Sequence, residues 1–269
     1  MFDYHLHTNF CGHGKGEPAD YVRAAIDRGY REIGFSCHLP KLDVPDPYHA
    51  MPRYMLPVYF DKLRALQKEY AGDIRIKIGI EADYLEGYEE MTSYLLASFP
   101  FDYVFGSVHF LDGWHFTSRE GRDRYDTMNP VEVFPRYFEE VRKVIETGLF
   151  DILSHPDAIR KEYFQPVKPL DGEYAGVADL LNEKGMSIEI NTAGLRREAG
   201  FIYPDRDFLR TCLDRGVPVT IGSDAHKPED LGRDFDRVRE ILAGSDKGNI
   251  AAYSRRKRTL IPFSEFTAG

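Results

Sequence analysis

The chain has 269 residues, with 35 Lys or Arg against 44 Asp or Glu, so its formal charge is −9 at pH 7. Hydrophobic residues make up 42% and charged residues 29%, which excludes an intrinsically disordered chain. The acidic balance argues against a protein that binds nucleic acid by bulk phosphate neutralisation. We expect a single catalytic domain over residues 1–269, because one α/β barrel commonly uses a chain of this length.

Cysteine use and the N-terminal sequence indicate the compartment. The three cysteines, Cys11, Cys37 and Cys212, are odd in number and form no CxxC pair, which favours a reducing environment. The N-terminus lacks the basic segment and apolar stretch of a signal peptide, and no run approaches the roughly 18 apolar residues of a membrane span. We therefore expect a cytoplasmic protein with neither a membrane nor nucleic acid as partner, and the oligomeric state stays open.

Seven β-rich runs alternate with helical patterns along the chain. The predicted strands are residues 2–7, 32–37, 75–83, 102–109, 151–155, 187–191 and 217–222. The clearest helix begins at Asn129-Pro130, a cap followed by a first-turn proline. Another helix is predicted from Pro228, with one apolar face made by Leu231, Phe235, Val238 and Leu242.

This alternation predicts an α/β fold with a parallel sheet and right-handed crossovers. A closed barrel and an open doubly wound sheet both fit the pattern. The first connection carries no GxGxxG, which weakens the dinucleotide-binding alternative.

Side chains that commonly bind metals gather where the predicted strands end. They are His5, His7, His13, His38, Glu81, His109, His155, Asp224 and His226. In a (β/α) barrel the carboxyl ends of the strands meet at one mouth, so these residues are expected to lie together. His49 and His115 fall in loops away from strand ends, and we leave them outside the set.

A single histidine after a strand, such as His155, is often only structural. Glu81 is harder to explain in that way, because an unpaired carboxylate inside an apolar strand costs several kcal/mol. Imidazole and carboxylate ligands without cysteine suit Zn, Mn or Fe, and nine of them exceed the needs of one ion.

The same residues resemble the ligand set of the polymerase-and-histidinol-phosphatase (PHP) superfamily. The similarity runs essentially end to end. Three stretches are similar to its histidinol-phosphate phosphatase branch: GSVHFLDGW at 106–114, ILSHPDAIRK at 152–161 and EINTAGLRR at 189–197. The resemblance implies a distorted (β/α)7 TIM-like barrel with a trinuclear metal site at the carboxyl ends of the strands.

Carried over residue by residue, the resemblance puts His5, His7, Glu81 and Asp224 on a first metal. Glu81 would bridge to a second metal on His109 and His155, and His13, His38 and His226 would hold the third. Cys37 precedes His38 where relatives often show Asp, so we expect altered support for that ligand at most.

The implied activity is hydrolysis of L-histidinol phosphate to L-histidinol and phosphate in histidine biosynthesis. A metal-bridging hydroxide would attack in line, with Asp224 or His226 as the proton shuttle to the leaving oxygen. Arg160 and Arg196 are the predicted phosphate-binding residues, with Arg197 as a neighbouring candidate.

The sequence also offers candidates for substrate contacts and for a lid over the site. Trp114, Phe116 and Tyr54 are candidate substrate contacts. The proline- and aromatic-rich loop 39–57 is either a lid over the mouth or an ordinary packed loop.

Three alternatives stay open. The first is a phosphoesterase that acts on nucleotides or another small phosphate ester. The second is amide hydrolysis in an amidohydrolase-like barrel, although His13, His38 and the arginine pair would have no obvious use there. The third is a non-enzymatic accessory module of a polymerase, which a complete ligand set argues against.

Overall fold

The computed structural model describes residues 1–44, 46–245 and 248–264. Its core is a nine-stranded sheet in the order β1-β2-β3-β4-β7-β8-β9-β10-β11. The first seven strands in this order pair in parallel with their neighbours. They are β1 (Phe2–Asp3), β2 (Glu32–Phe35), β3 (Arg75–Asp83), β4 (Tyr103–Ser107), β7 (Ile152–Leu153), β8 (Ser187–Asn191) and β9 (Val219–Gly222).

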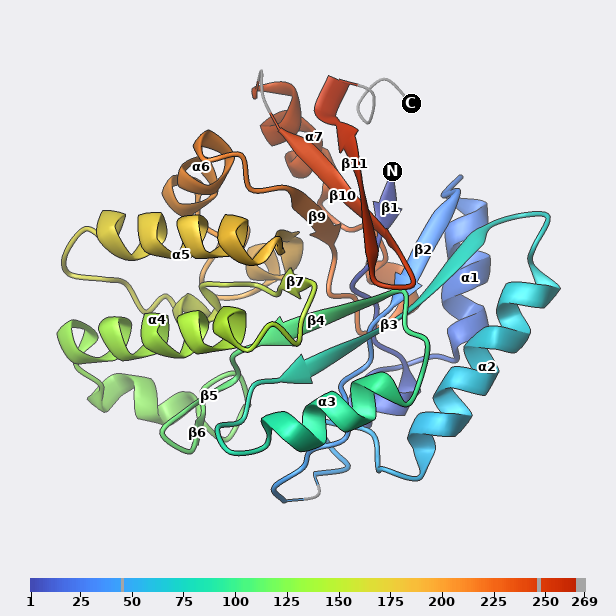
Figure 1. Cartoon of the computed structure of the whole chain (residues 1–269), viewed down its shortest axis with the longest axis horizontal. Helices are drawn as coiled ribbons and strands as arrows, with labels where there is room; N and C mark the ends of the chain where they lie inside the picture. The colour runs from blue at the N-terminus through green and yellow to red at the C-terminus, as the bar shows by residue number, and fades with distance from the viewer. Residues whose placement is uncertain (45, 246–247, 265–269) are drawn as a thin grey trace.

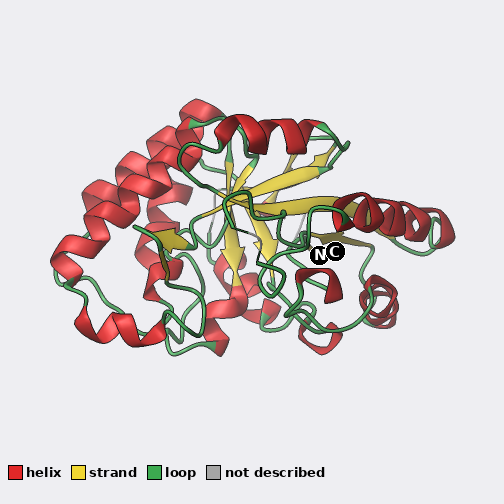
Figure 2. Cartoon of the chain, turned by 90° about the horizontal axis from the view of Figure 1, so that it is seen from below, coloured by secondary structure: helices red, strands yellow, loops and turns green. Residues whose placement is uncertain are grey.

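Helices cover the outside of this sheet, and Figures 1 and 2 show the strands at the centre with the helices around them. The helices are α1 (Pro18–Asp27), α2 (Met55–Glu69), α3 (Glu89–Ala97), α4 (Pro130–Glu146), α5 (Asp171–Lys184), α6 (Arg206–Asp214) and α7 (Phe235–Ala243). Each helix lies between two strands in the chain, as parallel pairing requires. Within the described ranges, no helix combines the length and the apolar character needed to cross a membrane.

All seven predicted strands are present and parallel, although several are shorter than predicted. The first ends at Asp3 rather than at residue 7. Beyond Asp3 the chain still bonds to β9 and to the segment after it: Tyr4 N donates to Ile221 O in β9 at 3.1 Å, and His7 N donates to Ala225 O at 2.9 Å. Because these bonds are sparse, β1 and β9 do not form a continuous ladder, and we call this region the seam.

The two helix predictions have different outcomes. The helix at Asn129-Pro130 is confirmed as α4, whose cap side chain accepts a hydrogen bond from Val131 N at 3.1 Å. The helix predicted from Pro228 is wrong at its start: α7 begins at Phe235 after a short 3-10 turn. Gly232 and Asp234 have φ of 63° and 64°, and this left-handed backbone interrupts the helix that the apolar spacing suggested.

Two antiparallel hairpins were not predicted. β5 (Phe110–Leu111) pairs with β6 (Trp114–His115), and β10 (Asn249–Ser254) pairs with β11 (Lys257–Pro262). The second hairpin extends the sheet past β9. Its turn residue Arg256 bonds to Asp151 at the amino end of β7, at 2.9 Å. This hairpin therefore lies at the end of the sheet opposite to the predicted metal ligands.

Aromatic side chains fill the interior below the strand ends. Tyr103 stacks on Tyr4 with ring centroids 4.7 Å apart and donates a hydrogen bond to Tyr4 O at 2.6 Å. Gly34 and Gly79 make room for it, because a Cβ at either position would come within 2.2 Å of the Tyr103 ring or hydroxyl. His5 stacks on Phe105 with centroids 4.6 Å apart. A packed aromatic layer thus supports the histidines above it.

Candidate active site

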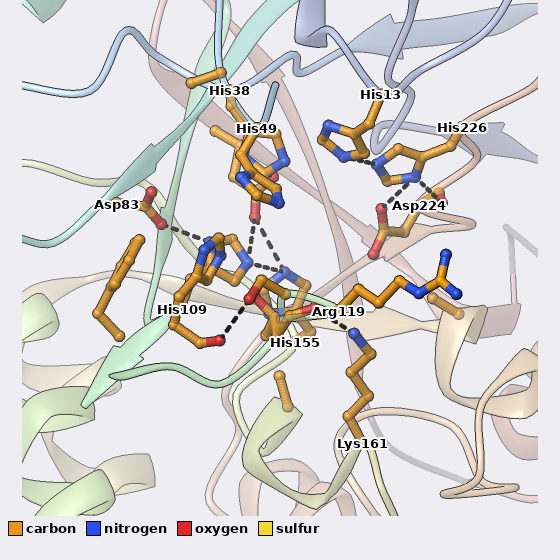
Figure 3. A pocket seen from close by; sticks show the side chains of 18 of the residues that line it. His13, His38, His49, Asp83, His109, Arg119, His155, Lys161, Asp224 and His226 are labelled. Carbon is orange, nitrogen blue, oxygen red and sulfur yellow. Dashed lines mark hydrogen bonds and ion pairs between the residues drawn. The ribbon is translucent and has the colours of Figure 1, made fainter. Parts of the chain in front are cut away.

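The nine predicted ligands come together at the carboxyl ends of the parallel strands. Each follows a strand directly or after a short loop, except Glu81, which lies inside β3. Figure 3 shows seven labelled members of the wider site converging from different elements: His13, His38, His109, His155, Asp224, His226 and Asp83. The sequence-based expectation that these positions share one mouth is therefore met by the geometry.

Glu81 lies at the centre of the cluster. Its Oε2 is 3.2 Å from His5 Nε2, 3.3 Å from His7 Nε2 and 3.1 Å from His38 Nδ1. Its Oε1 is 3.0 Å from His155 Nε2 and 3.6 Å from His109 Nε2. One carboxylate thus faces five imidazoles. Three of them lie next to Oε2 and the other two lie next to Oε1.

Asp224 forms the second acidic point of the cluster. Its Oδ1 is 3.4 Å from both His7 Nε2 and His226 Nδ1. His226 Nε2 in turn lies 2.8 Å from His13 Nε2. Asp224 has a φ of 53°, an uncommon conformation for a residue other than glycine, which turns its side chain toward the histidines.

Oxygen atoms behind the cluster fix how the imidazoles are oriented. His109 Nδ1 lies 2.5 Å from Asp83 Oδ1, and His5 Nδ1 lies 2.6 Å from Glu189 Oε1. His13 Nδ1 is held by two backbone carbonyls, those of Cys11 and Tyr48. In each case Nδ1 is engaged and Nε2 is left facing the cluster, which is how metal-binding histidines are commonly supported. The sequence analysis did not single out Asp83 or Glu189.

The charges of the two acidic groups follow from this packing. Burial alone would raise the pKa of Glu81, but His38, His5 and His155 hold it well below its ordinary value. Burial likewise opposes ionisation of Asp224, yet His5, His7 and His226 keep its pKa well below the usual range. Both side chains are therefore carboxylates at neutral pH, as ligands for a cation must be.

The donor set fits divalent ions. Ligand atoms lie within 4.8 Å of one another in four overlapping groups drawn from the nine residues: His5–His7–Glu81, His7–His38–His226, His5–His155–Asp224 and His38–Glu81–His109. Two buried nitrogens, His7 Nε2 and His155 Nδ1, have no hydrogen-bond partner. A coordinated ion would satisfy His7 Nε2, which faces both Glu81 and Asp224.

A cavity of about 690 Å³ opens above the cluster. Its walls carry seven of the nine ligands and a set of cations, which are Lys41, Arg119, Arg122, Lys161 and Arg197. In Figure 3, Lys161 reaches toward the cavity from the side opposite to His13. Burial lowers the pKa of Lys161 to about 8, with Arg197 adding to the effect. We call these five residues the cationic rim.

The two predicted phosphate-binding arginines, Arg160 and Arg196, are not among the residues that line this cavity. Arg160 is buried and forms ion pairs with Asp205 and Asp157, and its guanidinium lies over Phe201. Arg196 donates to the backbone carbonyls of Ser223, at 2.5 Å, and Asp224. The guanidinium groups are thus committed to protein acceptors.

Two of the cations that line the cavity, Lys161 and Arg197, directly follow these arginines in the chain. Arg160 ends the 3-10 helix η3 (Ala158–Arg160), and Arg196 ends η4 (Thr192–Arg196). In both cases the following residue, Lys161 or Arg197, points to the cavity instead. A one-residue difference in a tight turn redirects the side chain, so residue type and strand position could not distinguish the two.

The three candidate substrate contacts also lie outside the lining of the cavity. Trp114 is buried and donates to Gly121 O, Phe116 is fully buried, and Tyr54 is exposed, and none of the three lines the cavity. The predicted loop 39–57 ends within α2, which begins at Met55. Its residues Lys41, Tyr48, His49 and Ala50 do line the cavity, and residue 45 lies outside the described residues.

Cys37 is buried behind the ligands. Its Sγ accepts a hydrogen bond from Thr8 N at 3.3 Å, while the neighbouring Cys11 Sγ accepts from His38 N at 3.3 Å. Two thiols therefore support the loop that carries His7 and the residue His38. This agrees with the expectation that the cysteine changes only the surroundings of a ligand.

His49 and His115, left outside the predicted set, both line the cavity. They form a further group with Asp46 in which ligand atoms lie within 4.8 Å of one another. Burial and the nearby His109 lower the pKa of His115 to about 3, so its imidazole is neutral. The short i, i+3 spacing of Asp46 and His49 was the one sequence signal that could have pointed to this group.

A parallel sheet with a buried imidazole and carboxylate cluster at its carboxyl ends defines the class: an α/β protein with a candidate centre for divalent metal ions. The family model described as PHP domain matches residues 3–193. The chain belongs to the PHP domain family.

Relatives with assigned names support the membership. A probable histidinol-phosphatase of Deinococcus radiodurans is 37% identical over 90% of this chain and 92% of its own length. The histidinol-phosphatase of Bacillus subtilis is 28% identical over 88% of this chain and 98% of its own length. The structure of histidinol phosphate phosphatase from Lactococcus lactis, complexed with zinc, L-histidinol and phosphate, matches with a TM-score of 0.83 at 23% identity. That match covers 96% of this chain and 98% of the other, and it shows that the two share a fold.

Proposed function

We propose that the protein is a metal-dependent phosphatase that hydrolyses L-histidinol phosphate to L-histidinol and phosphate in histidine biosynthesis. The observation that carries the proposal is the single cavity in which the nine-residue cluster meets the cationic rim. Carboxylates and imidazoles suit metal ions, and lysine and arginine suit a phosphate dianion. The names of the relatives from Deinococcus radiodurans and Bacillus subtilis direct the proposal to histidinol phosphate among small phosphate esters.

We assign three divalent ions of the Zn, Mn or Fe type to the cluster. His5, His7, Glu81 and Asp224 would hold the first ion, and the group His5–His7–Glu81 supports this assignment. Glu81 would extend to a second ion on His109 and His155, supported by the division of its two oxygens between two sets of imidazoles. His13, His38 and His226 would hold the third, supported by the 2.8 Å approach of His13 and His226.

When bound, divalent ions supply an activated water and neutralise charge that develops on the phosphoryl oxygens. The protein residues position and balance this chemistry. Lys161 and Arg197 would bind the phosphoryl group from the wall of the cavity, in place of the predicted Arg160 and Arg196. Asp224 and His226, which also line the cavity, would pass a proton to the oxygen of the leaving alcohol.

The predicted barrel is part of this proposal. The parallel sheet with backbone bonds across the seam supports a distorted (β/α)7 barrel, with the hairpin β10–β11 added beside β9. We further propose that residues 1–269 act as one catalytic domain in the cytoplasm. The three free, buried cysteines support a reducing compartment.

The test measures phosphate release from L-histidinol phosphate, p-nitrophenyl phosphate and a nucleoside monophosphate by metal-replete protein. The controls are chelator-treated protein and His109→Asn. We expect rapid hydrolysis of histidinol phosphate alone, lost in both controls. Equal hydrolysis of all three esters would replace the substrate assignment with a general phosphoesterase. No release from any ester by protein with confirmed metal content would refute a phosphatase and favour the amide-hydrolysis or binding-module alternatives.

A further inference from the structure

Asp46, His49 and His115 form a second cluster of ligating side chains at the mouth of the cavity, which we call the rim triad. Asp46 and His49 belong to the segment 46–50 between β2 and α2, whereas His115 belongs to β6. His49 Nδ1 lies 2.7 Å from Asp46 Oδ2, and the rings of His49 and His115 meet edge to face with centroids 4.7 Å apart. Two segments more than sixty positions apart in the chain thus bring three potential metal-ligand atoms close together.

The rim triad is separate from the nine-residue cluster but adjoins it. The ring of His49 is 5.9 Å from that of His13, and the ring of His115 is 6.5 Å from that of His109. The rim triad shares no residue with the four ligand groups of the central cluster. An ion in the triad would therefore be a neighbour of the central ions and would not share their ligands.

The donor chemistry of the triad is that of a transition-metal site. Two imidazoles and one carboxylate, without a thiolate, favour zinc and similar ions over calcium or magnesium, which prefer oxygen. Backbone amides orient the carboxylate, because Asp46 Oδ1 accepts from Tyr48 N and His49 N, both at 3.2 Å. His115 is held in place by stacking on Phe110 with ring centroids 4.3 Å apart.

The existing distances are close to those that an ion requires. Adjacent ligand atoms of a tetrahedral zinc ion lie about 3.3 Å apart, given bonds of about 2.0–2.1 Å. The 2.7 Å between Asp46 Oδ2 and His49 Nδ1 would have to widen by roughly half an ångström. Both side chains are about one quarter exposed, at 26% and 24%, so a small side-chain rotation can supply this change.

We propose that Asp46, His49 and His115 form an additional binding site for a zinc-like divalent ion, separate from the central cluster. Three protein ligands leave a fourth position, as in zinc sites that accept a water or a substrate group. Because His49 and His115 line the cavity, that position opens to the same space as the central cluster. The ion would also link the segment 46–50 to the hairpin β5–β6 and so fix one wall of the cavity. The proposal does not depend on the phosphatase activity.

The test compares zinc content after equilibrium dialysis at graded free zinc concentrations, using the full chain and elemental analysis. The variant is His49→Gln with His115→Gln, which retains polar side chains of similar size. The matched control is Tyr48→Phe, because Tyr48 lies in the same segment and contacts His13 through its backbone carbonyl, which the substitution leaves unchanged. We expect the double variant to bind one zinc per chain fewer than the wild type, while Tyr48→Phe binds the same number.

A second variant separates this site from the central one. His109→Asn should lower the zinc content through the central cluster, and adding His49→Gln and His115→Gln to it should remove one further ion. Cobalt substitution provides an independent signal, since the visible absorption of the wild type minus that of the double variant should be that of one low-coordinate cobalt ion. Equal zinc content and equal affinity in the wild type and the double variant would overturn the proposal. A change in the KM for histidinol phosphate with unchanged zinc content would overturn it as well, because the triad would then contact substrate directly.

Discussion

The central cluster and the cationic rim share one cavity but are built differently. In the cluster several imidazoles are fixed from behind, as His109 is by Asp83 and His5 by Glu189, and Glu81 is only 1% exposed. On the rim, long side chains rise from loops, and Arg122 is 57% exposed. The difference indicates a division of work: the cluster holds reacting groups in fixed positions, and the rim attracts and orients a charged substrate. Substitutions in the two regions should therefore differ in size and in the kinetic parameter that they change.

The largest effect is expected from Glu81→Gln. The amide keeps the shape but removes the charge that faces five imidazoles and the proposed bridge between two ions. Metal content should fall, and kcat should drop by well over the roughly 100-fold that marks the upper end for residues that only orient a ligand. Elemental analysis and steady-state kinetics measure both. Retention of a tenth of the wild-type kcat with full metal content would contradict a bridging role.

Asp83→Asn should have the next largest effect. Asp83 touches the cluster only through His109 Nδ1, so its loss leaves every proposed ligand in place. We expect metal affinity to fall by about 10–100-fold, as for other carboxylates that orient a metal-binding histidine. Activity should recover when the metal concentration in the assay is raised. Activity that stays low at saturating metal would mean that Asp83 does more than orient His109.

Lys161→Met tests the rim at a cation whose pKa is lowered by burial. A hydrogen bond to a charged group contributes about 1.5–3 kcal/mol, so KM for histidinol phosphate should rise by roughly 10–100-fold. The metal content and the thermal stability should stay near those of the wild type. A loss confined to kcat would instead assign Lys161 to the reacting centre and weaken the division between the two regions.

The pH dependence of KM sharpens the same test. Burial lowers the pKa of Lys161 to about 8, so the ammonium is present below that pH and is lost as the pH rises through it. The phosphate ester is already a dianion there, because its second pKa is about 6. KM of the wild type should therefore increase above pH 8, whereas Lys161→Arg should keep a low KM to higher pH. Identical profiles for the two proteins would rule out Lys161 as the titrating group.

The smallest effect is expected from Arg122→Ala. Arg122 is exposed and already paired with Glu162 at 2.9 Å and Glu198 at 3.4 Å, so it contributes little net charge to the cavity. Exposed ion pairs contribute at most about 1 kcal/mol. KM and kcat should each change by less than about threefold, and a larger loss would show that the rim is not uniformly peripheral.

Sequence reasoning was effective where a backbone pattern fixes the side chain. His5 and His7 alternate with period two after a strand, and Glu81 lies within a buried one, so their common location could be predicted from the positions of the strands. The aromatic layer beneath them could not, because the contact of Tyr103 with Gly34 and Gly79 depends on three-dimensional packing between strands.

The residues of the cationic rim could not be predicted from the sequence for a related reason. Arg160 forms an ion pair with Asp205, which lies 45 positions later in the chain, and no local sequence pattern predicts that pairing. The final residue of a 3-10 turn and the one after it differ little in sequence terms, yet only the second faces the cavity. The sequence pattern likewise did not predict the hairpin β10–β11.

The seam between β1 and β9 has a consequence for motion. Few backbone bonds cross it, and His5 and His7 lie on one side while Asp224 and His226 lie on the other. Ions with ligands from both sides would connect the two sides of the seam. After loss of metal, local opening should therefore occur at the seam before any other part of the protein unfolds. In native-state hydrogen exchange the amides of Tyr4, His7 and Ala225 should exchange faster after chelation, while that of Ile80, in the middle of β3, should keep its protection. The same opening would give ions a route into and out of the cluster.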